Sequence, residues 1–192
     1  MYTKDEIRRI NKDLRSRLNS DEVREKSKSA SEHFLNSEFY KNSNVLMLYM
    51  PLGKETDTTD IFSKALLDGK KTIFPVTDPE TGVITPCYAD SEDGFTKGAF
   101  SVSEPSGEFV SDVSVIDVVL VPGIAYDRNG ARVGFGKGCY DRLLSRTKAF
   151  KIGFCYEFQI VDSISSDSHD IAVDYIVTEN GIWDVKQSCY FM

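Results

Sequence analysis

The sequence predicts an α/β protein, a three-layer α/β/α sandwich around a largely parallel central sheet. Residues 45–50 form a continuous apolar run and residues 115–121 a second strongly apolar one, and each run is followed by a proline. Such runs are typical of strands that are buried on both faces. Helical patterns alternate with the strands, which indicates parallel pairing with helices on both faces of the sheet. The length suits a single domain over residues 1–192.

Two helices are expected before the first strand. Thr3 and Glu6 form a capping box, and apolar residues follow at helical spacing. Asn19 and Glu22 repeat the capping signal, so a second helix follows the first directly. The residues expected to face inward are Ile7, Ile10, Leu14 and Leu18 in the first helix, and Val23, Ala30, Phe34 and Leu35 in the second.

The remaining elements follow from local patterns. Helical signals fill residues 58–67 and stop at Gly69. Residues 91–112 are rich in Ser, Gly, Glu and Asp, so we expect an irregular surface segment there. The other expected elements are a turn at 78–82 and strands over 72–76, 83–88, 150–156 and 175–178.

Composition limits the classes of function. Lys and Arg total 23 and Asp and Glu total 30, so the formal net charge is −7. This charge argues against a broad nucleic-acid surface but allows one anionic ligand in a locally basic cleft. The four cysteines form no C-x-x-C pair, no signal peptide is visible, and no apolar run approaches the roughly 20 residues that span a bilayer. We expect a cytoplasmic protein that binds neither nucleic acid nor membranes.

The most informative segment is 121–142, which begins at the end of a buried strand. In its run 134–138 (G-F-G-K-G) three glycines alternate, and Lys137 stands between two of them. A tight turn is expected at Asn129-Gly130, and a helix is expected to begin near Cys139. Glycines at this density allow successive backbone N–H groups to approach a ligand closely, and a helix N-terminus adds partial positive charge.

Charged residues surround this glycine loop. Arg132, Lys137 and Arg142 add full positive charges, so the segment predicts a cradle for a polyphosphate. Asp141 lies where a carboxylate could hold Mg²⁺ against phosphate oxygens. The alternative is a mobile surface loop with incidental charges, because the motif is neither a Walker A loop nor a G-x-G-x-x-G fingerprint.

Other candidate residues are less specific. Lys4 and Arg8 share one helix face, which is either a basic binding face or a solvated one. Glu55 follows the first central strand, where it either orients a polar substrate or complements the dipole of the next helix. Asp174 is either a second metal ligand or a loop carboxylate. No Ser-His-Asp or Cys-His arrangement indicates a nucleophile.

Residues 121–142 resemble the signature of the 5-formyltetrahydrofolate cyclo-ligase family, approximately V-P-G-x-A-F-D-x-x-G-x-R-L-G-x-G-x-G-Y-Y-D-R. The departures are Tyr126 for Phe, Val133 for Leu, and Cys139 for the first of the two tyrosines. The resemblance extends over nearly the whole chain. The other segments in family order are Lys4 to Arg8, Glu55-Thr56-Asp57, Glu104-Pro105, Gln159, His169-Asp170, Asp174 and Thr178-Glu179.

The resemblance implies an ATP- and Mg²⁺-dependent ligase on the three-layer fold. It would convert 5-formyltetrahydrofolate to 5,10-methenyltetrahydrofolate with release of ADP and phosphate. The formyl oxygen would be phosphorylated, and N10 of the same folate would attack. Its partners would be these small molecules, and we expect a monomer. A non-catalytic nucleotide or folate sensor, or an ATP-using enzyme that acts on another N-acyl substrate, are the competing hypotheses.

The resemblance also assigns roles by position, with Lys137 and Arg132 as the catalytic residues. The implied ATP contacts are Lys4, Asp5, Glu6, Ile7, Arg8, Arg132, Val133, Gly134, Phe135, Gly136, Lys137, Gly138, Cys139 and Tyr140. The implied folate contacts are Met50, Glu55, Phe135, Gly136, Lys137, Gly138 and Cys139. The implied Mg²⁺ ligands are Asp141 and Asp174.

Overall fold

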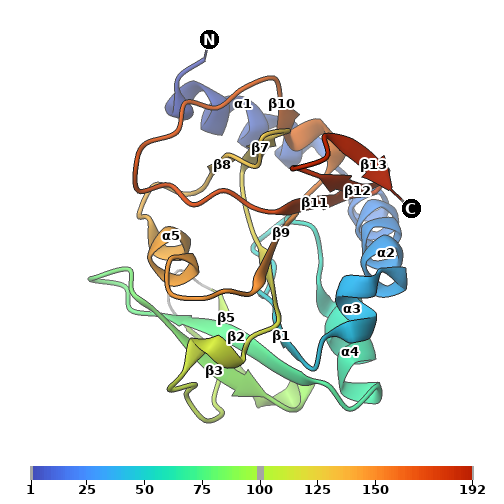
Figure 1. The fold of residues 1–192 in the computed structure, drawn as a ribbon, viewed down its shortest axis with the longest axis vertical. Coiled ribbons are helices and arrows are strands. Elements are labelled where there is room, and N and C mark those ends of the chain that lie inside the picture. Colours follow the sequence, from blue (N-terminus) through green and yellow to red (C-terminus); the bar gives the residue numbers. More distant parts are fainter. Residues whose placement is uncertain (1, 99–101, 192) are drawn as a thin grey trace.

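Eight strands form one largely parallel sheet at the centre of the protein (Figure 1). The structure is a computed structural model that describes residues 2–98 and 102–191. In these residues the strand order is β13-β12-β11-β9-β6-β1-β2-β3, and the five inner strands from β11 to β2 are parallel. The strands are β1 (Val45–Met47), β2 (Lys71–Thr77), β3 (Ile84–Ala89), β6 (Val118–Val121), β9 (Phe150–Phe154), β11 (Tyr175–Thr178), β12 (Gly181–Asp184) and β13 (Cys189–Phe191).

Helices cover both faces of this sheet, as the sequence predicts. In Figure 1, α2, α3 and α4 lie on one side of the sheet and α5 lies on the other. Both predicted capping boxes, at Thr3 and at Asn19, are formed. The helices are α1 (Lys4–Arg17), α2 (Ser20–Asn36), α3 (Glu38–Asn42), α4 (Thr59–Leu67) and α5 (Cys139–Leu144). None of the helices in the described residues is long and apolar enough to cross a lipid bilayer.

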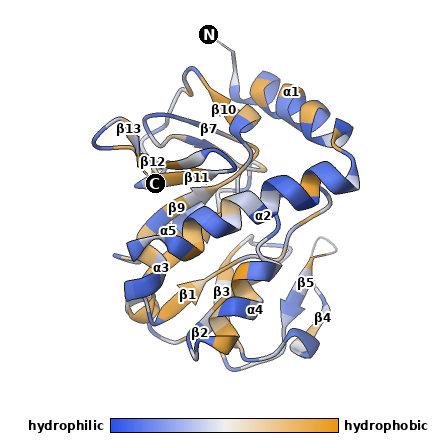
Figure 2. Ribbon diagram, turned by 90° about the vertical axis from the view of Figure 1, so that its right-hand side faces the viewer, coloured by the Kyte–Doolittle hydropathy of each residue, from blue (hydrophilic) through white to orange (hydrophobic). Residues whose placement is uncertain are grey.

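Strand β1 is covered on both faces, which accounts for the apolar run that begins at Val45. Successive residues of a strand point to opposite faces. Leu46 packs with Phe34 of α2 and Phe62 of α4 on one face, and Met47 packs with Leu144 of α5 on the other. Figure 2 shows the same pattern, with hydrophobic colour along the central strands and hydrophilic colour on the outer surfaces of the helices. Both faces are therefore buried.

Some element boundaries differ from the predictions. The run 115–121 becomes a strand only from Val118, because Val113–Val115 forms a 3-10 turn. Residues 91–112 are not simply irregular: a 3-10 turn at Glu92–Gly94 leads into a hairpin of β4 (Phe95–Lys97) and β5 (Ser103–Pro105). A third 3-10 turn spans Glu157–Gln159.

A second, small sheet carries the start of the glycine loop. It pairs β7 (Ala125–Asp127) with β8 (Arg132–Val133) and β10 (Ile160–Val161). The predicted turn at Asn129-Gly130 joins β7 to β8, with Gly130 at a φ of 84°. Helix α1 lies against this sheet, because Ile7 packs with Ala125 and Val133.

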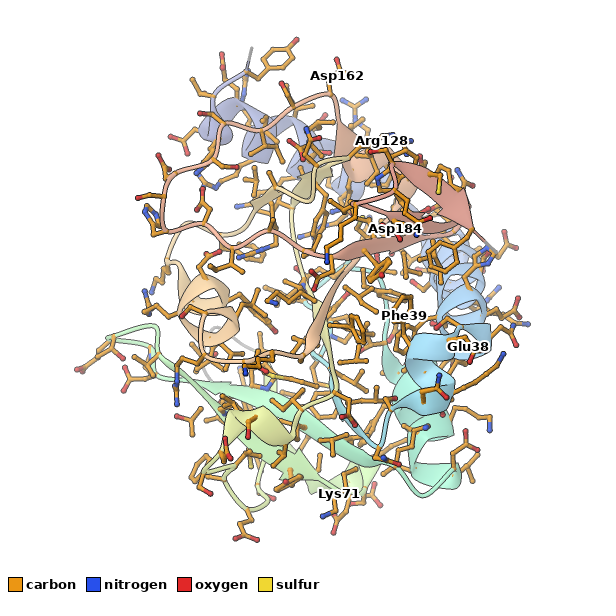
Figure 3. All side chains as sticks on the ribbon, viewed as in Figure 1. Glu38, Phe39, Lys71, Arg128, Asp162 and Asp184 are labelled. Atoms are coloured by element: carbon orange, nitrogen blue, oxygen red, sulfur yellow. The ribbon has the colours of Figure 1, made fainter. Side chains whose placement is uncertain are left out.

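The C-terminal hairpin of β12 and β13 is attached to the core by aromatic contacts. The guanidinium of Arg128, labelled in Figure 3, lies 4.2 Å from the ring centre of Trp183 and 5.1 Å from that of Tyr190. Arg128 also pairs with Glu157 at 3.2 Å. These strands extend the sheet in antiparallel fashion, which the alternating helix and strand pattern does not predict.

Candidate functional site

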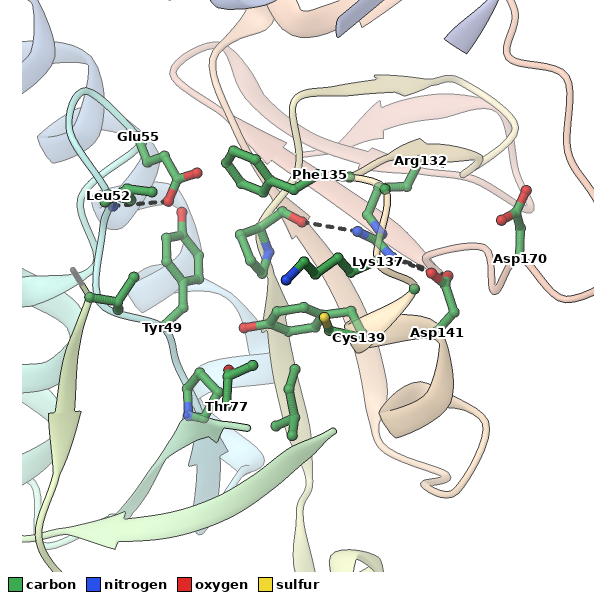
Figure 4. Close-up of a pocket in the computed structure, with 18 of the residues that line it drawn as sticks. Tyr49, Leu52, Glu55, Thr77, Arg132, Phe135, Lys137, Cys139, Asp141 and Asp170 are labelled. Carbon is green, nitrogen blue, oxygen red and sulfur yellow. Dashed lines mark hydrogen bonds and ion pairs between the residues drawn. The ribbon is translucent and has the colours of Figure 1, made fainter. Parts of the chain in front are cut away.

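A pocket of about 460 Å³ lies at the carboxyl ends of the parallel strands. Ligand sites in open α/β sheets are expected at this edge. Tyr49 and Met50 follow β1, Pro75 and Thr77 lie at the end of β2, and Pro122 follows β6, and all five residues line the pocket. The glycine loop and the start of α5 form its opposite wall (Figure 4).

The glycine loop has a backbone that other residues rarely adopt. Gly136 has a φ of 100° and Gly138 a φ of 62°, both in the left-handed region. Gly138 is also the N-cap of α5. A Cβ on Gly134 would lie 2.7 Å from Nη1 of Arg132. The glycines therefore permit both the turn into α5 and the close approach of the Arg132 guanidinium.

Arg132 and Asp141 form a nearly buried ion pair in the pocket wall. Nη2 of Arg132 lies 3.0 and 3.1 Å from the two carboxylate oxygens of Asp141. The side chains are only 7% and 16% exposed. Val133 turns into the small core beside α1, so the alternation along β8 directs Arg132 to the pocket. The backbone N–H of Ile171 also donates to Asp141, at 3.2 Å.

Helix α1 brings two more cations to the same end of the pocket. Nζ of Lys4 lies 2.7 Å from carboxylate oxygens of both Asp167 and Asp170. Nε of Arg8 donates to the carbonyl oxygen of Gly134 at 2.8 Å, which ties α1 to the glycine loop. Both side chains line the pocket.

The exposed residues Asp167 and His169 and the half-buried Asp170 form a group whose ligand atoms lie within 4.8 Å of one another. The ammonium of Lys4 already bridges the two carboxylates of this group. Partial burial lowers the pKa of Lys4, but the hydrogen bonds to the two carboxylates outweigh it, and the net shift is upward.

Lys137 lies between the two ends of the pocket (Figure 4). Its Nζ also donates to the carbonyl oxygen of Pro79 at 3.4 Å. Phe135, at the tip of the loop, is 53% exposed and presents its ring to the pocket mouth. A cation and an aromatic ring therefore face the space between the two ends.

A buried carboxylate occupies the other end of the pocket. Glu55 is 6% exposed, and its Oε2 accepts the N–H of Leu52 at 3.0 Å. Its Oε1 lies 3.3 Å from Nη1 of Arg15. Burial raises the pKa of Glu55, and the Leu52 N–H and Arg15 oppose that rise. A carboxylate with this setting can accept hydrogen bonds from N–H donors of a ligand.

Two tyrosines complete this end. The hydroxyl of Tyr49 donates to the carbonyl oxygen of Thr56 at 2.7 Å. The hydroxyl of Tyr140 is buried and, within the described residues, has no hydrogen-bond partner. Burial raises the pKa of both phenols, and the nearby Glu55 adds to the rise, so both stay protonated.

The structure brings most of the predicted site residues together. Those that line the pocket are Lys4, Arg8, Met50, Glu55, Arg132, Gly134, Phe135, Gly136, Lys137, Gly138, Cys139, Tyr140 and Asp141. Asp5, Glu6, Ile7 and Val133 do not. Asp5 pairs with Arg8, Glu6 caps α1, and Ile7 and Val133 pack in the small core.

Two of the candidate residues do not line the pocket. Arg142 is not a pocket cation: its guanidinium donates to carbonyl oxygens of Thr81, Gly82 and Lys137, and so attaches the 78–82 turn to the glycine loop. Asp174 does not line the pocket either. It precedes β11 at the amino ends of the parallel strands, where it accepts the N–H of Lys151 at 2.9 Å. Asp141 and Asp174 therefore lie at opposite edges of the sheet.

No local sequence pattern marks several of the pocket residues as functional. Tyr49 lies inside an apolar run, and Asp167 in a loop. Glu104 reaches the pocket from β5 and accepts the N–H of Thr77 at 2.9 Å. Its place in the family order of motifs is the signal that could have identified it. Arg15 pairs with Glu55 from outside the pocket, and only tertiary structure brings the two together.

Comparison with known proteins agrees with this geometry. A model of the 5-formyltetrahydrofolate cyclo-ligase family matches residues 1–179. The chain belongs to this family. It is 27% identical over 190 residues to a probable 5-formyltetrahydrofolate cyclo-ligase of Caenorhabditis elegans, with 92% of each chain covered. The 5-formyltetrahydrofolate cyclo-ligase of Escherichia coli K12 is 24% identical over 148 residues, which cover 74% of this chain and 81% of that protein.

Solved structures share the cyclo-ligase fold. The NMR structure of 5,10-methenyltetrahydrofolate synthetase from Aquifex aeolicus matches with a TM-score of 0.84 and 34% identity, over 98% of this chain and 96% of that one. A 5,10-methenyltetrahydrofolate synthetase from Mycoplasma pneumoniae has the same fold, with a TM-score of 0.72, 22% identity, and coverage of 93% and 99%. The largely parallel sheet is therefore that of known members of the family.

Proposed function

We propose that this chain converts 5-formyltetrahydrofolate to 5,10-methenyltetrahydrofolate while ATP is converted to ADP and phosphate. Membership of the cyclo-ligase family supports the reaction. The observation that carries the proposal is one pocket with four cations at or near one end and a buried carboxylate at the other. The cations are those of Lys4, Arg8, Arg132 and Lys137, and the carboxylate is that of Glu55. The cation end also holds Asp141, Asp167 and Asp170, which pair with Arg132 and Lys4. A mixed cluster of this kind suits a polyphosphate with its Mg²⁺, and the Glu55 end suits a nitrogen-rich ring.

The triphosphate of ATP belongs at the glycine loop. Gly134 to Gly138 can present N–H groups to phosphate oxygens, and Arg132 and Lys137 add positive charge. Charge on the transferred phosphoryl group needs such neutralisation, because phosphoryl transfer is catalysed mainly by positioning and electrostatics. Lys4 and Arg8 are held at this end by hydrogen bonds to the Asp170 carboxylate and to the carbonyl oxygen of Gly134.

Asp141 is the residue that would hold Mg²⁺. It fits because a carboxylate that faces the cation end of the pocket supplies the hard oxygen that Mg²⁺ prefers, and proteins often give this ion only one or two carboxylates besides the phosphates. Bound there, Mg²⁺ would neutralise charge on the phosphates. Arg132 pairs with Asp141, so the guanidinium and the carboxylate are held in place together.

The folate belongs at the Glu55 end. Glu55 can accept hydrogen bonds from N–H groups of the pterin ring, and Met50 offers an apolar contact beside it. The exposed ring of Phe135 lies between the two ends of the pocket and can contact both ligands. This arrangement would bring the formyl oxygen toward the γ-phosphate near Lys137.

The chemistry needs no nucleophile from the protein. An N-formyl carbonyl is a poor electrophile, because its nitrogen donates electrons into the carbonyl group. When the formyl oxygen attacks the γ-phosphorus, the bond to ADP breaks and the oxygen becomes part of a leaving group. N10 then attacks the formyl carbon, loses its proton, and phosphate leaves with the electron pair. The protein positions the two ligands, which makes the ring closure effectively unimolecular.

A turnover assay tests this function. Mixing the protein with 5-formyltetrahydrofolate, ATP and Mg²⁺ should produce methenyl-folate absorbance and one ADP for each product. Binding of ATP or the folate in calorimetry, without turnover, would identify a sensor. ADP release with another N-acyl compound but not with the folate would identify a different ligase. Either of these results in correctly folded protein contradicts the proposal.

The cellular location and the oligomeric state are predicted from the sequence and its resemblance to the family. A cytoplasmic location and a monomeric state stay predictions, for which fractionation of the source cells and light scattering are the measurements. Four Lys and Arg side chains converge on this pocket although the net charge of the chain is −7, and these side chains are the ones that would contact the two anionic substrates.

A further inference from the structure

Arg15 lies outside the pocket, but it contacts the carboxylate that forms one of its ends. Its Nη1 is 3.3 Å from Oε1 of Glu55, and the two side chains are 12% and 6% exposed. Resting on the proposed function, we propose that Arg15 is a positioning residue that holds Glu55 ionised and oriented for the folate. Arg15 does not line the pocket and acts only through Glu55.

The placement of Arg15 on α1 connects it to the nucleotide end. At 100° per residue, Lys4, Arg8 and Arg15 point within about 40° of one another. One face of α1 therefore carries the two pocket cations in its first turns and the Glu55 partner in its last turn. The same rigid element contacts both ends of the pocket.

The segment around Glu55 is attached to the end of α1 by a second contact. Nζ of Lys54 donates to the carbonyl oxygens of Ser16 and Leu18, at 2.5 and 2.6 Å. These acceptors lie at the C-terminal end of the helix, where a cation is favoured by the dipole. Lys54 thus fixes the backbone of this segment, and Arg15 fixes the side chain of Glu55.

In the part of the chain that the structure describes, Arg15 is the charged side chain that pairs with the Glu55 carboxylate. The Leu52 N–H donates to Oε2. The hydroxyl of Tyr156 donates to the backbone carbonyl of Glu55 at 3.2 Å and leaves the carboxylate free.

Three tyrosines interact electrostatically with this carboxylate: Tyr49, Tyr126 and Tyr140. All three are uncharged, because burial raises the pKa of each phenol. Arg15 is therefore the cation that offsets the desolvation of this carboxylate.

This arrangement predicts a specific kinetic signature. Burial raises the pKa of Glu55 and Arg15 opposes the rise, so removing Arg15 moves the pKa further upward. A protonated Glu55 loses acceptor capacity for the folate. Loss of Arg15 should weaken folate binding most at acidic pH while leaving ATP binding, about two helical turns away, largely intact.

The first experiment measures KM for each substrate in Arg15→Gln. We expect KM for 5-formyltetrahydrofolate to rise about tenfold to hundredfold at pH 7, with KM for ATP changed less than about twofold. The acidic limb of kcat/KM for the folate should move to higher pH, because Arg15 no longer opposes the rise in the pKa of Glu55. Arg17→Gln is the matched control, because Arg17 lies on the same helix, is 70% exposed and pairs with the exposed Asp13. It should behave as wild type.

A second set of variants separates positioning from loss of folding. Arg15→Lys keeps the charge and should recover part of the folate affinity. In a background of Glu55→Gln, which has no charge to hold, Arg15→Gln should add less than about twofold to KM, because the two residues act as a unit. Circular dichroism of each variant establishes that it is folded.

The outcomes distinguish this inference from the proposed function. If wild type shows no turnover, the function fails and Arg15 is then judged by calorimetry with 5-formyltetrahydrofolate alone. If wild type turns over but the Arg15→Gln acidic limb does not move, or its effect adds fully to that of Glu55→Gln, the positioning role of Arg15 is overturned while the function stands.

Discussion

Arg132 and Asp141 share one ion pair in the wall of the pocket, with Nη2 of the arginine 3.0 and 3.1 Å from the two carboxylate oxygens. Arg132 comes from β8 and Asp141 from the first turn of α5, so the pair closes the glycine loop that runs between them. This pair therefore holds both ends of the loop that is expected to bind phosphates. Such preorganisation lowers the cost of binding.

The first prediction concerns Asp141→Asn, which keeps the shape of the side chain but removes its charge. It leaves the nearly buried guanidinium of Arg132 without a countercharge and weakens the proposed Mg²⁺ site. We expect turnover to fall about a hundredfold and the Mg²⁺ concentration for half-maximal rate to rise.

The matched variant for Asp141→Asn is Asp174→Asn. Asp174 lies at the amino ends of the strands and should leave the Mg²⁺ dependence as in wild type. A rise in the Mg²⁺ requirement with Asp174→Asn would show that Asp174 contributes to the Mg²⁺ site.

Lys137→Ala removes the cation that extends between the two ends of the pocket. Its side chain is exposed, so we expect an unchanged circular dichroism spectrum and melting temperature. The rate at saturating substrates should fall by about 10²- to 10³-fold, as for the loss of one group that stabilises developing charge. Lys28→Ala removes an equally exposed lysine from α2 and serves as the control. Equal rates in the two variants would exclude Lys137 from the phosphoryl transfer.

Tyr140→Phe tests whether the buried hydroxyl of Tyr140 binds a substrate. Within the described residues this hydroxyl makes no hydrogen bond, so its removal should change the free energy of unfolding by less than about 0.5 kcal/mol. If a ligand provides the missing partner, kcat/KM falls about tenfold in the variant. The substrate whose KM rises identifies the ligand that the hydroxyl meets, and wild-type kinetics would show that it meets neither.

The ion pair between Lys4 and Asp170 predicts a pH-dependent stability. Partial burial raises the pKa of Asp170, but the Lys4 ammonium and the Asp167 N–H outweigh it, so the pKa lies below the usual 3.8. A lowered pKa stabilises the folded state above that value, and the contribution is lost as the pH falls through the folded pKa.

Urea unfolding measures this contribution. Asp170→Asn should lower the free energy of unfolding by about 1 kcal/mol at pH 7, and the difference should shrink below about pH 4. Asp13→Asn, which breaks an exposed pair with Arg17, should have less than half of this effect. A difference that stays constant down to pH 3 would contradict the ion-pair explanation.

Local sequence determined much of the fold. The capping boxes at Thr3 and Asn19, the apolar run that begins at Val45 and the turn at Gly130 depend on neighbours in the chain, and each is found where the pattern predicts it. The antiparallel strands β12 and β13 were not predicted, because they extend an edge of the sheet through pairing with residues that lie outside their own local pattern.

In the site, too, some features depend on local sequence and others depend on tertiary structure. The residues of the glycine loop are contiguous, so the sequence alone determined that Gly134 to Asp141 would form a dense, charged turn at the end of a strand. That α1 brings Lys4 to the loop, that Arg15 reaches Glu55 and that Asp174 lies at the opposite edge of the sheet were decided by tertiary structure. Propensity and spacing act over a few residues, whereas these contacts join segments 23 to 166 positions apart and depend on how whole elements pack.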